Sequence, residues 1–374
     1  MKIRIIILRI SKVVLQGVYA LMKLRSIRRK VTILSRQSNE PSTDIALLAC
    51  YLEENHPDLN VKVMCRRFEE GGVFAYGLHM LRQMWNMADS KVVLLDSYCI
   101  AASILKHRKD TEVIQMWHSM AAIKQFGYQT LDRPGGRSSD IARALCMHRN
   151  YDRVLCPSKA TGDHFCRAFD IDGSVLLPMA LPRVDLITGP DEKRNELREK
   201  YSIDPDKEIL LYAPTFRKSD QLKVDELIRN VDRKRFQLVI CPHPLDESPC
   251  LDTLEEEGLT VDRDGETIHW LAVADRVITD YSAVALEAAI GDKPVYFYVY
   301  DIEEYSRSEG LNVDPRTEVP GITAIDSHEL AELLDREYPF DELVRFRDKY
   351  FEVETENSTS KLGEYIYGLS EKKH

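Results

Sequence analysis

The sequence predicts an α/β protein built from two Rossmann-like halves. Its 374 residues suffice for two domains. After Lys30, short apolar runs alternate with segments of helical pattern, and a charged stretch at 189–201 interrupts this alternation before it starts again. The expected parts are a basic amphipathic segment (1–30), an N-terminal domain (31–188), a C-terminal domain (189–345) and a C-terminal helix that could pack back on the N-terminal domain (346–374).

Each half has its own series of expected strands and helices. In the first half the strands are 31–35, 61–65, 91–96, 113–117, 153–156 and 174–177, and the helices are 43–54, 73–87 and 160–169. In the second half the strands are 209–213, 236–241, 276–279 and 294–298, and the helices are 224–230 and 283–291. Ligands bind beyond the carboxyl ends of strands in such sheets, so residues directly after a strand are the site candidates.

The N-terminal segment is basic and apolar, with no acidic residue before Glu40. Its longest uncharged run, 13–22, is about half of the roughly 20 residues that span a bilayer, and charges interrupt any signal-peptide core. A helix here would have one apolar face rich in isoleucine and one polar face. We expect it to lie peripherally on the anionic cytoplasmic face of the cell membrane through Lys2, Arg4, Arg9, Lys12 and Lys23. The alternative is a helix packed on the protein core with its basic residues in solvent.

Composition argues against several other classes of protein. A net charge of −10 disfavours nucleic acid as the main partner. The eight cysteines show no metal-ligand spacing, and neither a P-loop nor a dinucleotide-binding glycine motif occurs. We therefore expect no metal and no cofactor. The pattern gives no indication of an oligomeric state.

Two segments after expected strands carry groups suited to catalysis or phosphate binding. His118 directly follows a strand and has the side chain of a general base, although a structural histidine is equally compatible with this position. Pro214, Thr215 and Arg217 follow the strand 209–213, and the arginine offers a planar fork for phosphate.

Two further segments have the same placement. His243 stands between two prolines after an apolar strand, which favours a functional histidine over a buried loop histidine. Asp280, Tyr281 and Ser282 connect a strand to a helix, where free amides hold a phosphate. Glu287, in the second turn, could hold the two hydroxyls of a ribose. Alternatively, Ser282 is only an N-cap and Glu287 a surface acid.

In this order, the segments resemble the CDP-glycerol glycerophosphotransferase family of teichoic acid and capsule synthesis. The landmarks are Trp117-His118, Lys124, Phe126-Gly127, Asn150-Tyr151-Asp152, Phe169, the run 181–185, Tyr212 to Thr215 with Arg217, His243-Pro244, Thr279 to Ser282, Lys293-Pro294, Tyr300-Asp301 and Glu304-Tyr305. The resemblance implies a GT-B fold with a central cleft, a CDP-donor site in the C-terminal domain and an acceptor site in the N-terminal one. It implies that His118 is the base and that His243 assists at the donor diphosphate, with Trp117, Ser119, Lys124 and Arg183 on the acceptor side.

The resemblance also implies a reaction. Glycerol phosphate would pass from CDP-glycerol to an undecaprenyl-diphosphate-linked glycan acceptor, with release of CMP and without a metal. The length is closer to that of primases, which add one unit, than to that of polymerases. The alternatives are a CDP-ribitol donor, a GT-B glycosyltransferase or epimerase that uses a UDP-sugar, and a membrane-bound scaffold without activity.

Overall fold

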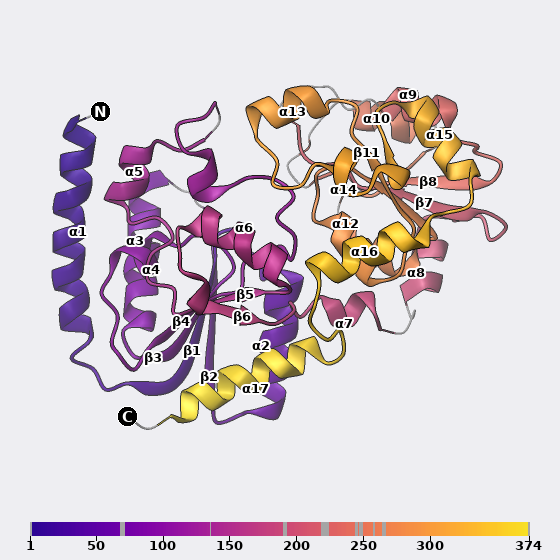
Figure 1. Ribbon diagram of the computed structural model, residues 1–374. Helices are drawn as coiled ribbons and strands as arrows, with labels where there is room; N and C mark the ends of the chain where they lie inside the picture. Colours follow the sequence, from indigo (N-terminus) through magenta and orange to yellow (C-terminus); the bar gives the residue numbers. More distant parts are fainter. Residues whose placement is uncertain are drawn as a thin grey trace. The chain divides into compact units, whose positions relative to one another are not determined.

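The structure is a computed structural model that describes residues 2–67, 72–134, 136–189, 193–217, 224–243, 246, 250–256, 259–263 and 267–372. The chain forms two compact α/β units (Figure 1). Unit 1 comprises Met1–Met120, Phe126–Arg183 and Glu356–His374, and unit 2 comprises Ala121–Gln125 and Val184–Thr355. Unit 1 therefore lacks the short segment 121–125, and the chain passes from unit 1 to unit 2 after Arg183 rather than after residue 188.

Unit 1 is built on a six-stranded parallel sheet of order β2-β1-β3-β4-β5-β6. Its strands are β1 (Arg28–Ser35), β2 (Asn60–Cys65), β3 (Ser90–Leu95), β4 (Glu112–Gln115), β5 (Arg153–Cys156) and β6 (Leu176–Pro178). All six overlap expected strands, and the apolar runs of the central strands β1, β3, β4 and β5 are buried in the core. The edge strand β6 is half buried at Leu176 and Leu177 and exposed at Pro178. The edge strand β2 is only half buried.

Helices cover this sheet. They are α1 (Lys2–Met22), α2 (Thr43–Asn55), α3 (Gly72–Met87), α4 (Ile100–Ile104), α5 (Ser139–Ala144), α6 (Lys159–Phe169) and α17 (Ser358–Glu371), with 3₁₀ turns at Gly127–Thr130 and Gly173–Val175. The last helix contacts α2, β1 and β3, and a side chain at Gly363 would collide with the Tyr51 ring. The expected helix 346–374 is in fact two elements, because α16 (Phe340–Tyr350) ends in unit 2 before α17 begins in unit 1.

Unit 2 repeats the plan with a parallel sheet of order β12-β11-β10-β7-β8-β9. Its strands are β7 (Glu208–Tyr212), β8 (Phe236–Ile240), β9 (Thr260–Val261), β10 (Arg276–Thr279), β11 (Val295–Tyr298) and β12 (Thr323–Ala324). The described helices are α7 (Val184–Ile187), α8 (Lys193–Lys200), α9 (Val224–Asn230), α10 (Cys250–Glu256), α11 (Thr267–Val273), α12 (Val284–Ile290), α13 (Ile302–Ser308), α14 (Pro315–Glu318), α15 (Ser327–Asp335) and α16, with a 3₁₀ turn at Pro320–Ile322. The sequence did not indicate β9 and β12, since two residues are too few to show a pattern.

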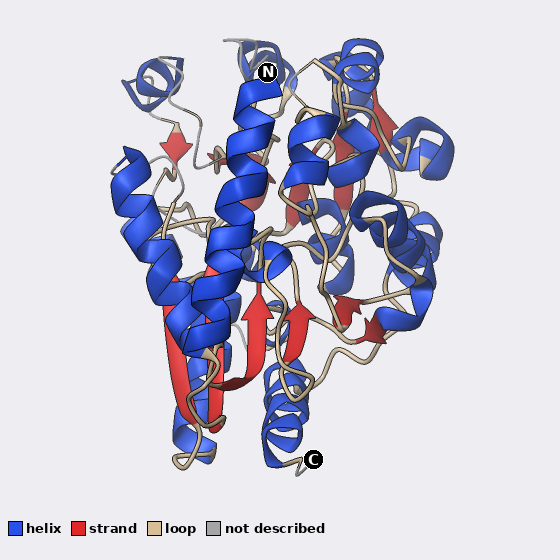
Figure 2. Ribbon diagram, turned by 90° about the vertical axis from the view of Figure 1, so that its left-hand side faces the viewer, coloured by secondary structure: helices blue, strands red, loops and turns tan. Residues whose placement is uncertain are grey.

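Helix α1, which begins at the N-terminus (Figure 2), has the two faces that the sequence predicts. Its orientation is the reverse of that in the alternative, in which the apolar face would pack on the protein core and the basic residues would lie in solvent. Lys12 Nζ lies 2.7 Å from Cys146 Sγ, Lys23 Nζ donates to the Lys106 carbonyl at 2.7 Å, and Tyr19 is buried. The opposite face leaves seven apolar side chains 54–75% exposed, namely Ile3, Ile6, Ile7, Ile10, Val13, Val14 and Leu21. The polar face therefore packs on unit 1, whereas the apolar face does not.

This orientation changes the expected set of membrane-contacting residues. Lys12 and Lys23 contact the protein, Arg9 is exposed, and the side chains of Lys2 and Arg4 lie outside the described part of the chain. By length and composition alone, the helical segment Ile5–Met22 would also be able to cross a membrane. The sequence had argued against a membrane span, because its longest uncharged run, 13–22, is only about half of the length needed.

Candidate functional site

In unit 1, the residues after β4 form the most distinctive local geometry. Trp117 has a φ of 60°, a left-handed conformation that costs a bulky residue about 1–3 kcal/mol. Its indole stacks on Phe126 with ring centroids 5.1 Å apart, and it meets Phe169 edge-on at 5.0 Å. This aromatic packing holds the strained turn, which presents His118 directly after it.

His118 is held by groups from the ends of two neighbouring strands. Its Nδ1 lies 3.0 Å from the carbonyl oxygen of Asp96, which follows β3, and 3.0 Å from the side-chain amide of Gln37, which follows β1. A carbonyl only accepts, so the tautomer with the proton on Nδ1 satisfies the contact to Asp96 and leaves Nε2 as the basic nitrogen. The Gln37 amide nitrogen only donates, so in this tautomer it contacts Nδ1 without a hydrogen bond. The half-buried His118 is thus oriented as a general base. Ser119, also half buried, is the next residue.

Asp96 adds a buried carboxyl group beneath this site. Burial raises its pKa to about 6, partly offset by the hydroxyls of Ser35 and Ser97. These same hydroxyls accept the backbone N–H groups of Gln37 and Arg36, each at 3.2 Å. Neither Asp96 carboxylate oxygen has a hydrogen-bond partner among the described residues, so Ser35 and Ser97 hold the loop that carries Gln37. The rule that predicted His118 also applies to Asp96 and Gln37, since both follow strands, but their residue types alone did not single them out.

Arg183, expected on the acceptor side, is committed to a buried partner. Its backbone N–H and its Nε donate to the Asp44 carboxylate at 2.9 and 2.8 Å, and Nη2 lies 2.6 Å from Oδ2. Asp44 is 1% exposed, in the first turn of α2. Arg183 therefore joins the end of the segment 126–183 to α2, and its three contacts with the buried Asp44 carboxylate indicate a structural role.

Lys124 differs from the expectation, because it belongs to unit 2. The segment 121–125 pairs with 310–313: Gln125 N–H donates to the Gly310 carbonyl at 3.0 Å, and Asn312 N–H donates to that of Ile123 at 2.8 Å. Burial lowers the pKa of Lys124, against the attraction of Asp280 and Glu309. Lys124 therefore lies among the candidate donor residues and not among those of the acceptor domain.

A buried ionic network fixes the loops after β7 and β10. Asp280 accepts from the Thr215 N–H at 3.0 Å and its hydroxyl at 2.6 Å, and from Arg217 Nη1 at 2.7 Å. Arg217 Nε also donates to Asp301 at 2.8 Å. Burial alone would lower the pKa of Arg217, but the two carboxylates raise it above its ordinary value. The expected open fork is therefore wrong: the Arg217 guanidinium ties three loops together.

The other expected donor residues fall into buried and accessible groups. Tyr281 is buried, stacks on Tyr305 and donates to Asp301 at 2.9 Å. Glu287 is only 4% exposed, so it is not a surface acid. Ser282 is half buried, and its Oγ accepts the Val284 N–H at 3.4 Å. Pro214 is buried immediately before Thr215. The network thus shapes the turn at Ser282, while Asp280 and Tyr281 themselves are structural.

His243 remains accessible after β8. It is half buried, with its ring 5.7 Å from the Phe216 ring. Burial and then the positive charge of Lys124 lower its pKa. Pro244, the second proline of its motif, lies outside the described residues. No cluster of three or more His, Cys, Asp or Glu side chains that could hold a metal occurs in the described part of the chain.

Comparison with known proteins gives a consistent set of similarities. The family described as CDP-Glycerol:Poly(glycerophosphate) glycerophosphotransferase matches residues 18–368. A teichoic acid glycerol-phosphate primase of Bacillus spizizenii is 30% identical over 84% of this chain and 82% of its own length. A teichoic acid ribitol-phosphate primase of the same organism is 29% identical over 90% of each chain. The wall teichoic acid polymerase TagF has a TM-score of 0.76 at 17% identity, covering 98% of this chain and 97% of its own.

Proposed function

Because the chain belongs to the CDP-glycerol:poly(glycerophosphate) glycerophosphotransferase family, we propose that it transfers glycerol phosphate from CDP-glycerol to an undecaprenyl-diphosphate-linked glycan acceptor. The family comprises CDP-polyol phosphotransferases of teichoic acid synthesis, and the chain has their GT-B fold. The glycerol donor, the lipid-linked acceptor and the release of CMP are our proposal. A UDP-sugar enzyme, the alternative considered from sequence, is not supported by the family.

The observation that carries the proposal is the orientation of His118. With Nδ1–H directed at the Asp96 carbonyl, Nε2 takes the proton of an acceptor hydroxyl. The hydroxyl oxygen forms a bond to the phosphorus that bears glycerol, and the bond from that phosphorus to the CMP oxygen breaks. The electron pair of the broken bond leaves with CMP. Such a transfer depends mainly on alignment and charge balance.

Unit 2 would supply the charge balance for the donor. Lys124 is its cationic candidate, His243 can donate a hydrogen bond from its accessible ring, and the backbone amides around Ser282 are further candidate donors for the diphosphate. Arg217 contributes indirectly, because Asp280 and Asp301 already balance its charge. We propose that this arrangement works without a metal ion.

The apolar face of α1 supports a membrane location. Isoleucine and valine side chains that remain exposed along one helix face suit the boundary of lipid headgroups and acyl chains. We propose that unit 1 lies on the cytoplasmic face of the membrane through this face. Attraction by the basic residues is then secondary, because Lys12 and Lys23 contact the protein.

The test is product analysis with three donors. Purified protein is incubated with membranes that hold the acceptor and with CDP-glycerol, CDP-ribitol or UDP-N-acetylglucosamine. We expect CMP from CDP-glycerol; CMP from CDP-ribitol alone would favour the second candidate, which the ribitol-phosphate primase motivates. UDP release would reject both.

Histidine variants test the assigned roles. His118→Ala should lower turnover by about 100-fold or more, with donor affinity unchanged. His243→Ala should instead weaken CDP-glycerol binding. His328→Ala, at an exposed position on α15, is the control and should behave as wild type. A parallel fall of turnover and donor affinity in His118→Ala would move this histidine to the donor site.

A further inference from the structure

Unit 1 contains a cavity of about 450 Å³ at the sheet edge, outside the candidate residues described above. Strand β2, helix α3 and the loop after β1 line it. Its polar lining residues include Lys62 from β2, His79 and Arg82 from α3, and Asn39 from the loop. Two of these carry full positive charges.

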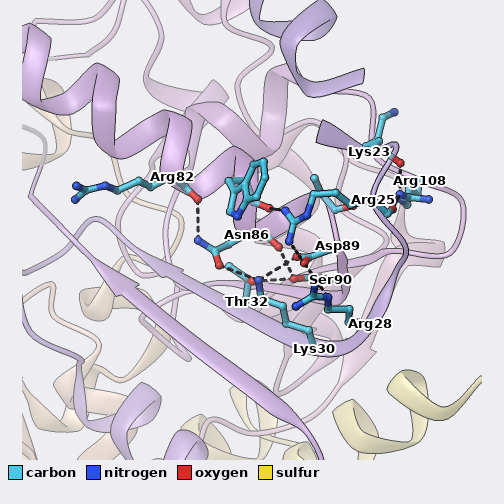
Figure 3. A network of polar contacts seen from close by, with 12 residues as sticks. Lys23, Arg25, Arg28, Lys30, Thr32, Arg82, Asn86, Asp89, Ser90 and Arg108 are labelled. Carbon is cyan, nitrogen blue, oxygen red and sulfur yellow. Dashed lines mark hydrogen bonds and ion pairs between the residues drawn. The ribbon is translucent and has the colours of Figure 1, made fainter. Parts of the chain in front are cut away.

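The two cations of this cavity are available to a ligand. Nearby Arg25, Arg28 and Lys30 share Asp89, which neutralises part of their charge (Figure 3). Arg82 contributes only its main-chain carbonyl to this network, and its guanidinium points away from it. Lys62 and Arg82 are both exposed and have no acidic partner among the described residues. Unpaired cations at a concave surface favour a bound anion.

The cavity adjoins the His118 site through the loop after β1. Asn39 lines the cavity and accepts the Arg67 N–H at 3.0 Å, while Gln37, two residues earlier, contacts His118. Burial, with Asp96 and Glu40 nearby, raises the pKa of the cavity residue Cys65 to about 11. These acids disfavour an anion at Cys65, so Lys62 and Arg82 mark the part that accepts one.

Helix α3, which lines the cavity, also exposes apolar side chains to solvent. Residues 79, 82 and 86 of α3 face the cavity, whereas Leu78, Leu81 and Trp85, each one position earlier and about 100° round the helix, are 37–50% exposed. Helix α1 packs beside α3 (Figure 2), and Arg25 lies over the Trp85 ring at 3.9 Å. Helix α3 thus exposes apolar side chains next to the cationic cavity, and α1, which packs beside α3, exposes further ones.

We propose that the Lys62–Arg82 cavity binds a lipid-borne diphosphate, with the lipid chain along the exposed faces of α3 and α1. This rests on the proposed function, in which the acceptor is attached to such a lipid. The cavity would hold the diphosphate, and the attached glycan would extend toward His118. Lys62 and Arg82, which belong to none of the sequence motifs, would then bind substrate.

The test measures binding of farnesyl diphosphate, inorganic pyrophosphate and farnesol to the full chain by calorimetry. The variant Lys62→Gln/Arg82→Gln removes both cations, and Lys109→Gln/Arg167→Gln removes two exposed cations elsewhere in unit 1 as a matched control. We expect farnesyl diphosphate to bind the first variant at least about 10-fold more weakly, the usual effect of losing charge-assisted contacts. The control should bind as wild type, and farnesol should not distinguish the proteins.

Other results would overturn the proposal. Equal affinity for pyrophosphate and farnesyl diphosphate would show a site for free anions. Weaker binding of the first variant to phosphatidylglycerol vesicles, with farnesyl diphosphate binding unchanged, would assign the cavity to phospholipid headgroups. Unchanged binding of every probe would leave no ligand role for Lys62 and Arg82. If wild type binds farnesyl diphosphate through this cavity but releases no CMP from CDP-glycerol, the proposed function fails and the lipid diphosphate site stands.

Discussion

Replacement of Arg217 by alanine should mainly lower the free energy of unfolding of the protein. Any effect on ligand binding should be the smaller one. The Arg217 side chain is 6% exposed and pairs with Asp280 at 2.7 Å and Asp301 at 2.8 Å. Its removal leaves the Asp280 carboxylate, 1% exposed, with only neutral donors from Thr215 and Tyr281. Breaking a buried pair by deleting one partner costs about 3–5 kcal/mol. That is a large part of the roughly 5–15 kcal/mol that stabilises a typical domain.

An exposed ion pair in the same unit supplies the control. Arg263 Nη2 lies 2.5 Å from Asp252, but these side chains are 34% and 69% exposed. Arg263→Ala should therefore cost at most about 1 kcal/mol. Urea unfolding followed by circular dichroism gives both values, provided that the slope with denaturant is unchanged.

The decisive comparison is between stability and donor binding. If Arg217→Ala unfolds at the same urea concentration as Arg263→Ala but no longer binds CDP-glycerol, the guanidinium serves the donor and the reasoning from burial is refuted. If it unfolds earlier, and CDP-glycerol added in excess restores part of the stability, the network shapes a donor site that still forms.

Four further predictions follow from the described contacts and surfaces. The pKa of Asp96 is about 6 against an ordinary 3.8, so wild type should lose about 3 kcal/mol of stability as the pH rises from about 3 to 8, most of it between pH 4 and 6. Asp96→Asn should therefore be the more stable protein at pH 8 but not at pH 4, as measured by urea unfolding. Arg183→Ala should cost about 3–5 kcal/mol by the same measurement, because Asp44 would remain buried without its partner. Replacement of Ile6, Ile10 and Val13 by serine should abolish sedimentation with anionic vesicles; unchanged sedimentation would mean that another surface binds lipid. Turnover should survive EDTA, and loss with rescue by Mg²⁺ would reveal a metal site.

The sequence predicted the features that depend on local pattern. Strands such as β3 are buried apolar runs, and the rule that sites follow strands located His118. The remaining features depend on contacts distant along the chain. Arg217 pairs with Asp301 across 84 positions, so its fork could not be known to be occupied. A helical wheel gives two faces of α1 but does not tell which face packs on the protein.

Lys124 shows the same limit at the level of whole segments. Nothing in 121–125 differs locally from its neighbours, yet pairing with 310–313 assigns it to unit 2. The motif signal at Lys124 therefore placed this residue in the wrong unit. Contacts of this kind can be found only when the three-dimensional pairing is known.

The placement of α17 has a consequence for biosynthesis. Leu362 and Ile366 are fully buried in unit 1, yet they are translated after all of unit 2. At about 5–20 residues per second, the apolar surface of α2 that receives α17 stays uncovered for roughly ten seconds or more while unit 2 is made. During that interval a nascent chain is exposed to aggregation and to chaperones. A ribosome that stops after residue 355 would release a protein whose second unit is complete and whose first is not.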